Sequence, residues 1–172
     1  YYFKIKPINI TLRMSQELNE RLRKIRTEYS RETLDEKSVE ADPIHQIRYW
    51  INEAIKAEVN EPTAMTLATA GKNCNPTARI VLLKSVENSG LVFFTNYNSR
   101  KGEDIKNNPK ACINFFWPEL QRQVRIEGKV EKISSSESNE YFHSRPHQSK
   151  IGAWASSQSE KLDSRDALEE KM

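Results

Sequence analysis

Residues 79–101 read RIVLLKSVENSGLVFFTNYNSRK, and this stretch decides the fold. Two apolar runs rich in β-branched and aromatic residues flank a short polar link that contains Gly90. Such a pattern predicts a β-hairpin. After the second strand, Ser99 is a favourable helix N-cap, so the sequence predicts a helix from Arg100 to residue 107.

Two cations open this predicted helix, although the N-terminus of a helix already carries a positive partial charge. A bound anion, most simply a phosphate, would balance Arg100 and Lys101 and accept hydrogen bonds from the free amides. The alternative is a solvated basic turn, which would be the better interpretation of an isolated Arg-Lys pair. Arg79 and Lys84 on the adjoining strand shift the balance towards a ligand that carries a phosphate.

The composition is typical of a globular protein with a well-charged surface. Of the 172 residues, 37% are hydrophobic and 30% are charged, which suits one domain with its own core. The net charge of +3 suits small phosphorylated ligands and is too weak to predict nucleic-acid binding. No apolar run approaches a membrane span and the start lacks a signal-peptide pattern, so a cytoplasmic protein is expected.

Neither the cysteines nor the histidines have the spacing of a metal site, so no metal is predicted. Cys74 and Cys112 are instead expected to be buried or inert thiols in a reducing compartment.

The order of predicted elements indicates an α+β fold that is mainly antiparallel. Residues 1–41 are expected to form an extended arm and a helix that starts after Ser15, and residues 42–172 a single domain. Asp42 and Pro43 open a helix predicted to run to Val59. Strands are predicted at 63–70, at 75–86 with its hairpin partner, at 111–117 and at 123–130, and further helices at 134–145, 148–156 and 164–172. These closely spaced strands with helices at the ends predict a small closed barrel with flanking helices.

Three motifs in this order resemble those of the pyridoxine/pyridoxamine 5'-phosphate oxidase family: RIVLLK at 79–84, FFTNYNSRK at 93–101 and YFHSRP at 141–146. The resemblance covers roughly residues 42–160, and several ordered motifs are more specific than a single one. It implies an FMN-binding split β-barrel that forms a homodimer. It also implies FMN-dependent oxidation of pyridoxamine or pyridoxine 5'-phosphate to pyridoxal 5'-phosphate, with O2 as acceptor. A catalytically weak FMN- or pyridoxal-phosphate-binding protein of the same fold is the alternative.

The resemblance assigns the flavin phosphate to Arg79, Arg100 and Lys101, and implies that Lys84 lies near both flavin and substrate. Strict alternation puts Arg79 and Lys84 on opposite faces of one strand. Both could contact the same ligand if the strand contains a bulge, or if one side chain reaches around the strand edge. Other expected flavin contacts are the strand residues Ile80, Val81, Leu82 and Leu83, the pair Phe94 and Thr95, and the polar residues Gln123, Gln158 and Ser159. Without the family, the strand residues would be interpreted as core and the last three as surface.

The resemblance assigns the substrate phosphate to Tyr141, Arg145 and Ser149. Their even spacing puts them on one face of a continuous helix, whereas Pro146 favours a turn-like arrangement. Without the family, they would be interpreted as a cluster that caps a helix end. Arg26 and Tyr29 resemble an N-terminal segment that closes over the substrate in the family. No catalytic residue is assigned, because the cofactor carries the redox chemistry.

The family's closing segment carries a Trp beside the flavin and an Arg-x-His motif beside the substrate. This sequence has no counterpart of that segment before Met172. The chain is therefore expected to be a fragment or a shortened homologue.

Overall fold

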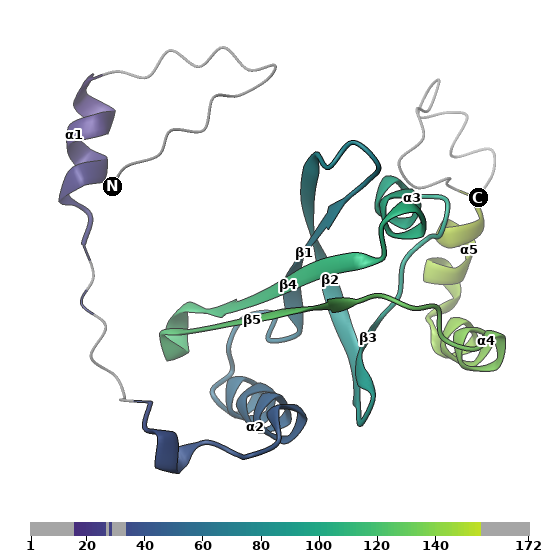
Figure 1. Ribbon diagram of the computed structural model, residues 1–172, viewed down its shortest axis with the longest axis horizontal. Helices are drawn as coiled ribbons and strands as arrows, with labels where there is room; N and C mark the ends of the chain where they lie inside the picture. The colour runs from purple at the N-terminus through teal and green to yellow at the C-terminus, as the bar shows by residue number, and fades with distance from the viewer. Residues whose placement is uncertain (1–15, 27, 29–33, 156–172) are drawn as a thin grey trace. The chain divides into compact units, whose positions relative to one another are not determined.

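The computed structural model describes residues 16–26, 28 and 34–155 (Figure 1). The chain divides into two units, Tyr1–Thr33 and Leu34–Met172. The first unit contains helix α1 (Gln16–Lys24), which begins where the sequence predicts a helix after Ser15. The second unit contains the sheet and the remaining described helices. No helix within the described ranges is both long and apolar enough to cross a membrane.

The elements of the second unit lie close to their predicted positions. In chain order they are η1 (Glu36–Ser38), α2 (Pro43–Lys56), β1 (Ala64–Ala70), β2 (Pro76–Glu87), β3 (Gly90–Phe93), α3 (Arg100–Asn107), β4 (Lys110–Trp117), η2 (Pro118–Leu120), β5 (Arg122–Lys129), α4 (Ser135–Ser144) and α5 (His147–Ala155). The helix predicted at 164–172 lies outside the described residues.

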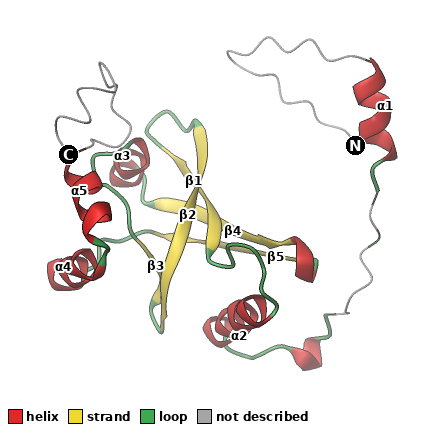
Figure 2. Cartoon of the chain, turned by 180° about the vertical axis from the view of Figure 1, so that it is seen from behind, coloured by secondary structure: helices red, strands yellow, loops and turns green. Residues whose placement is uncertain are grey.

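The five strands form one antiparallel sheet with the order β3-β2-β1-β4-β5. Figures 1 and 2 show that β4 and β5 run across the direction of β2 and β3, so the sheet is strongly twisted and curled. The α+β, mainly antiparallel architecture is therefore as predicted. The curled sheet keeps β3 and β5 as its two edges.

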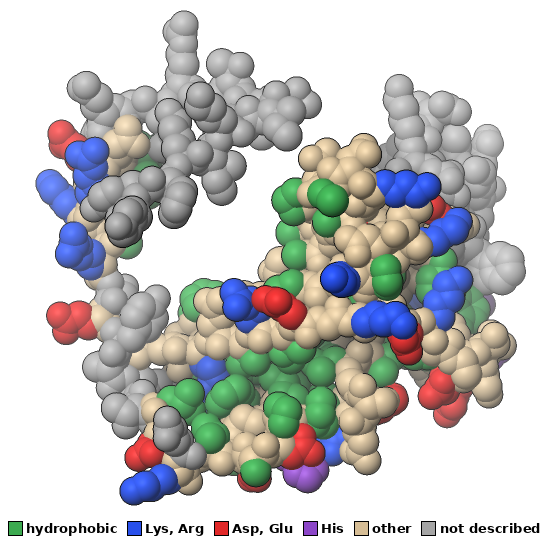
Figure 3. Space-filling model, viewed as in Figure 1, with side chains coloured by type: hydrophobic (Ala, Val, Ile, Leu, Met, Phe, Trp, Pro, Cys, Tyr) green, Lys and Arg blue, Asp and Glu red, His purple; other side chains and the backbone are tan. Residues whose placement is uncertain are grey.

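The core lies between one face of the sheet and α2. Phe115 and Trp117 from β4 are almost fully buried there, and Ile47 and Ile51 from α2 pack into the same cluster. Trp117 also donates from Nε1 to the carbonyl oxygen of Pro62 at 2.9 Å, which satisfies its polar atom. In Figure 3 apolar side chains reach the surface between β5 and α2, at the margin of this core.

A bulge at Lys84 changes which side chains of β2 face the core. Leu83 pairs with Phe93 and Ser85 pairs with Val92, so Lys84 is an extra residue between them. Up to Leu83 the odd-numbered side chains are buried or half-buried, whereas after the bulge Val86 packs against the core. A bulge is one of the two arrangements expected to reconcile Lys84 with Arg79, but Lys84 is exposed here whereas Arg79 is half-buried, and no contact joins the two side chains among the described residues.

Helix α2 ends at Lys56, and the prediction that it continues to Val59 is wrong. The Val59 amide donates to the Ala54 carbonyl at 3.0 Å and the Glu58 amide to the Ile55 carbonyl at 3.1 Å, while Glu58 has φ 52°. These bonds and the left-handed residue are a Schellman motif. Val59 is the apolar residue at the end of this motif, and it is buried. Its position therefore continues the apolar repeat of α2 in the sequence, although Val59 is not helical.

The turn between β1 and β2 contains Cys74, which has φ 56° and is exposed to solvent. Of the two expectations, buried or inert, burial is therefore not found for this thiol, and its inertness stays a prediction. Cys112 on β4 is half-buried, and both thiols are free.

Candidate functional site

The N-terminus of α3 is built around Ser99, whose side chain is fully buried. The hydroxyl donates to the Asn96 carbonyl at 2.6 Å and accepts from the Gly102 amide at 3.4 Å. Ser99 is therefore the N-cap that the sequence predicts. Gly102 is needed here, because a Cβ at this position would clash with the carbonyl oxygen of Tyr97.

Lys101 follows this cap and is a buried cation, only 8% exposed. Its Nζ donates to the Ser99 hydroxyl at 3.2 Å. Burial and, to a smaller extent, the nearby Arg79 lower the pKa of Lys101 below its ordinary value. Both effects disfavour the charged amine, so a bound anion would relieve them.

The guanidinium of Arg79 is held by the two strands beside α3. Nη1 donates to the Thr69 hydroxyl at 2.7 Å and to the carbonyl oxygens of Leu67 and Thr77 at 3.1 and 3.2 Å. Nη2 donates to the Thr77 hydroxyl at 2.6 Å. Burial lowers the pKa of Arg79, Asp104 opposes this shift, and Arg100 adds to it. An arginine nevertheless stays charged, so the site keeps a fixed cation.

Asp104 of α3 completes this cluster. Its Oδ2 accepts from the hydroxyls of Thr69 and Thr77 at 2.9 and 2.8 Å and lies 3.9 Å from Nη2 of Arg79. Burial alone would raise the pKa of Asp104, but the two threonine bonds and the charges of Arg100 and Arg79 outweigh it and lower the pKa. Asp104 is therefore ionised at neutral pH.

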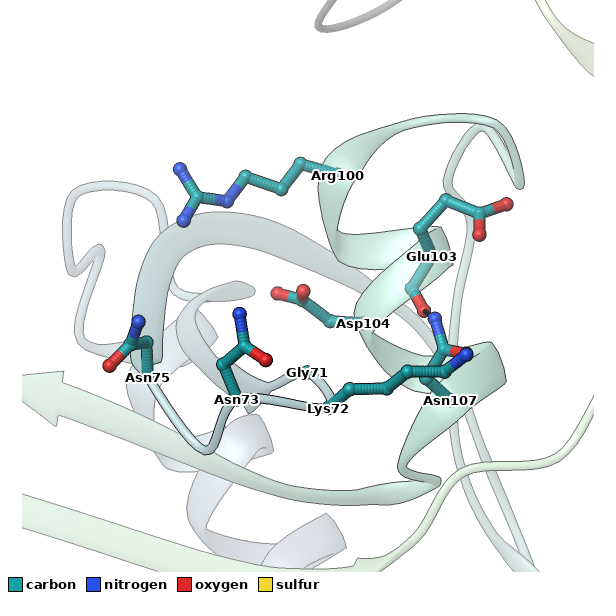
Figure 4. Close-up of a pocket in the computed structure, with 8 residues that line it drawn as sticks. All are labelled: Gly71, Lys72, Asn73, Asn75, Arg100, Glu103, Asp104 and Asn107. Carbon is teal, nitrogen blue, oxygen red and sulfur yellow. Dashed lines mark hydrogen bonds between the residues drawn. The ribbon is translucent and has the colours of Figure 1, made fainter.

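Arg100 extends over a pocket of about 210 Å³ between α3 and the β1–β2 turn. Figure 4 shows its side chain reaching towards the asparagines of the turn, while Asp104 points into the space between the two elements. The lining residues are Gly71, Lys72, Asn73, Asn75, Arg100, Glu103, Asp104 and Asn107. Arg100 is the one predicted flavin residue among them, so this pocket is at most the margin of the predicted site.

Phe94 and Tyr141 join the predicted flavin residues to the predicted substrate residues. Their rings are stacked, with centroids 3.5 Å apart and planes only 3° from parallel. Beside Phe94, the hydroxyl oxygen of Thr95 is buried and has no hydrogen-bond partner in the described part of the chain. A buried polar atom of this kind needs a partner, and a ligand could supply one.

The predicted substrate-phosphate residues lie on two helices instead of one. Helix α4 begins with a capping box at Ser134 and Glu137 and ends at Ser144. Arg145 has extended backbone angles, and Ser149 belongs to α5. The continuous-helix arrangement is therefore wrong, and the turn-like one is found because Pro146 cannot donate a helical hydrogen bond.

The other predicted site residues are spread over the chain. Val81 and Leu83 are buried, whereas Ile80 and Leu82 are exposed on the opposite face of β2. Gln123 is exposed on β5, and Arg26 is exposed in the first unit. Tyr29, Gln158 and Ser159 lie outside the described residues. Within the described ranges, His, Cys, Asp and Glu side chains form no group that could hold a metal.

Thr69, Thr77 and Asp104 were missed by sequence reasoning. The two threonines pair directly across the β1–β2 hairpin. Hairpin register alone would have found that pair, but nothing in the sequence links it to Asp104.

Comparisons with known proteins match most of this chain. The family described as pyridoxamine 5'-phosphate oxidase matches residues 51–172. A pyridoxine/pyridoxamine 5'-phosphate oxidase of Mannheimia succiniciproducens is 57% identical over 147 residues, which cover 86% of this chain and 70% of the relative. One of Cytophaga hutchinsonii is 53% identical over 148 residues, covering 86% and 69%.

Solved structures support the fold. PhzG from Burkholderia lata, in complex with tetrahydrophenazine-1-carboxylic acid, is 28% identical with a TM-score of 0.77, covering 81% of this chain and 70% of that one. A pyridoxamine 5'-phosphate oxidase-related, FMN binding protein from Nostoc punctiforme is 20% identical with a TM-score of 0.51, covering 76% and 73%. The sheet is therefore the FMN-binding split barrel, and the chain belongs to the pyridoxine/pyridoxamine 5'-phosphate oxidase family of oxidoreductases.

Proposed function

We propose that this protein oxidises pyridoxamine or pyridoxine 5'-phosphate to pyridoxal 5'-phosphate, with FMN as cofactor and O2 as acceptor. The observation that carries the proposal is the gathering of Arg79, Arg100 and Lys101 around the N-terminus of α3. The charges of Arg100 and Lys101 both act on Arg79, and the Asp104 carboxylate counters Arg79 and Arg100. A phosphate monoester would be attracted by this group of cations.

The described residues fit the phosphate end and the ring of FMN. Lys101 and Arg100 would bind the phosphate, with Arg79 as the cation on the strand side. Thr95, whose buried hydroxyl has no partner among the described residues, would hydrogen-bond to the ligand, and the backbone of β2 would lie along the ring. When bound, FMN supplies the electron acceptor for the substrate and passes the electrons on to O2.

The residues after α4 would hold the substrate. Arg145 and the hydroxyls of Tyr141 and Ser149 would bind the substrate phosphate, with each charge-assisted bond worth about 1.5–3 kcal/mol. The stack of Tyr141 on Phe94 connects this group to a predicted flavin residue. Binding would orient C4' of the substrate, which would lose a hydride while a proton leaves its amine or hydroxyl group. With pyridoxamine phosphate the resulting imine would be hydrolysed by water to the aldehyde and ammonia. Two electrons and two protons would convert O2 to hydrogen peroxide.

A homodimer is part of the proposal, because one face of the sheet is apolar and exposed. Ile80 is 64% exposed, Leu82 39% and Phe116 55%. The register of β2, β1 and β4 puts all three on the face opposite the core, and Gln123 pairs with Phe116 on the same face. A second copy covering this face would bring Gln123 near the partner's flavin.

The phosphate site is tested by titrating the 172-residue chain with FMN and following flavin fluorescence. In a double variant, Arg100→Ala with Lys101→Ala, we expect FMN affinity to fall by about 100-fold or more, since two charge-assisted bonds are lost. The matched control, Lys106→Ala with Lys110→Ala, removes the same charge at and beyond the other end of α3 and should bind FMN nearly normally. Equal affinities in the two double variants would refute the phosphate site.

A further inference from the structure

We propose that Asp104, acting through the hydroxyls of Thr69 and Thr77, is a positioning residue that aims Arg79 at the flavin phosphate and so makes the site prefer FMN to riboflavin. This inference rests on the proposed function, because it requires a phosphate beside Arg79. Asp104 touches neither cofactor nor substrate in this account. It acts through Arg79 and through the position of α3.

Chemistry fixes the direction of every hydrogen bond that Arg79 or Asp104 makes in this cluster. An ionised carboxylate only accepts and a guanidinium only donates. Each threonine hydroxyl has one proton, and Asp104 lies nearer, at 2.8 and 2.9 Å, than the other hydroxyl at 3.1 Å. The protons of Thr69 and Thr77 therefore point to Asp104, and their lone pairs face Arg79.

This polarity leaves one side of the Arg79 guanidinium for a ligand. Nη1 and Nη2 make the contacts with the two strands, and no described residue accepts from Nε. A guanidinium binds phosphate best through two parallel N–H groups, so one anchored edge and one open edge suit that task. The distance of 3.9 Å between Nη2 and Asp104 is too long for a hydrogen bond. The carboxylate thus orients the threonines and does not itself occupy the open edge.

The cluster also fixes α3 to the strands. Asp104 belongs to the helix, whereas Thr69 and Thr77 face each other on β1 and β2. Lys101 and Arg100 lie on the same helix, one turn before Asp104. A single carboxylate therefore sets the position of the helix cations relative to the strand cation. A Cβ at Gly71 would lie 2.8 Å from Oδ1 of Asp104, so a side chain there would push the carboxylate from this position.

The test compares the affinities of the full chain for FMN and for riboflavin, which differ only in the phosphate. We expect Asp104→Ala to lower the FMN-to-riboflavin affinity ratio by about tenfold, with riboflavin affinity nearly unchanged. Asp104→Asn, which keeps an acceptor oxygen for the threonines, should retain more of the ratio. Glu103→Gln is the charge control: it removes a carboxylate from the preceding position of α3, which pairs with Lys106 at 3.6 Å, and should keep the wild-type ratio.

A second pair of variants keeps the inference testable if Asp104→Ala fails to fold. Thr77→Val removes the hydroxyl with little change in shape, whereas Thr77→Ser keeps it, so only Thr77→Val should lower the ratio. An unchanged ratio in Asp104→Ala and Thr77→Val would overturn the positioning role alone. So would a raised ratio in Asp104→Ala, because it would mean that the carboxylate only competes with the phosphate. A wild-type chain that binds FMN no better than riboflavin would instead overturn the phosphate site of the proposed function.

Discussion

Lys101 is the residue at which we expect flavin binding to depend on pH. Its amine is buried beside another cation, and both features lower its pKa from the ordinary 10.5. The unfolded chain therefore holds this proton over an alkaline range in which the folded chain has lost it. Across that range the ligand-free protein gains stability as the pH rises. Phosphate binding has the opposite dependence, because it needs the protonated amine.

The FMN-to-riboflavin affinity ratio should accordingly fall as the pH is raised from about 8 towards 10.5, where the phosphate is already a dianion. Riboflavin is the internal reference, since ionisation of the flavin ring affects both ligands alike. Fluorescence titrations at several pH values measure the ratio. In Lys101→Met the ratio should be lower and nearly independent of pH. A wild-type ratio that is constant or rises over this range would show that Lys101 does not bind the phosphate.

Helix α3 is the element that carries most residues of the candidate phosphate site. Ser99 caps it, Lys101 is buried beside that cap, and Asp104 ties it to the two strands. The cap is a local interaction, whereas the other contacts depend on where the helix packs. Disturbing the cap should therefore affect both stability and binding.

We expect Ser99→Ala to lower the free energy of unfolding by about 1–3 kcal/mol, because a helix cap is lost and the Asn96 carbonyl loses a buried donor. It should also lower FMN affinity more than riboflavin affinity. Ser134→Ala is the matched control, since it removes the equivalent cap of α4 and should cost about 1 kcal/mol. Urea unfolding and the two flavin titrations separate these effects. A change of the FMN-to-riboflavin ratio in Ser134→Ala equal to that in Ser99→Ala would count against a specific role of α3.

At the end of α2, by contrast, we expect a substitution that stabilises the fold. Glu58 adopts φ 52°, a left-handed conformation that costs about 1 kcal/mol for residues with a Cβ. Glu58→Gly should therefore raise the free energy of unfolding by about 0.5–1 kcal/mol. Lys56→Gly, two residues earlier and inside the helix, should lower it by about 1 kcal/mol. Urea unfolding of both variants checks the pair, and destabilisation by Glu58→Gly would contradict the Schellman motif.

These elements also indicate what the sequence can predict. The hairpin, the Ser99 cap and the Asp42 cap were predictable because each depends on residues that are adjacent in the chain. The end of α2 was not, since Val59 continues the apolar repeat while packing after a Schellman motif. The Asp104 cluster was not predictable either, because it requires the β1–β2 register and the packing of α3 together.

At the scale of the whole molecule, the two faces of the sheet differ in what covers them. One face packs on α2 and forms the core, and the other exposes Ile80, Leu82 and Phe116. An apolar face of this kind on a curled sheet is typical of an interface between protein chains. The proposed second copy would explain why the predicted flavin residue Gln123 lies on that face and away from Arg79.

We expect Phe116→Glu to shift the protein from dimer to monomer, because a charge would be buried without a partner at the interface. Sedimentation equilibrium measures the mass directly. Ile55→Glu is the control, since Ile55 on α2 is 51% exposed and Phe116 is 55% exposed. A wild-type chain that sediments as a monomer, or equal effects of the two substitutions, would argue against this face as the interface.

The central claim is that this chain holds FMN and reduces it with a vitamin B6 phosphate. The direct measurement is the visible absorbance of the 172-residue protein, mixed with FMN and desalted, before and after anaerobic pyridoxamine 5'-phosphate. The account predicts that the flavin band is retained and then bleaches. A retained band that stays oxidised would contradict the oxidase and leave a flavin-binding protein, and no retained flavin would contradict the cofactor site itself.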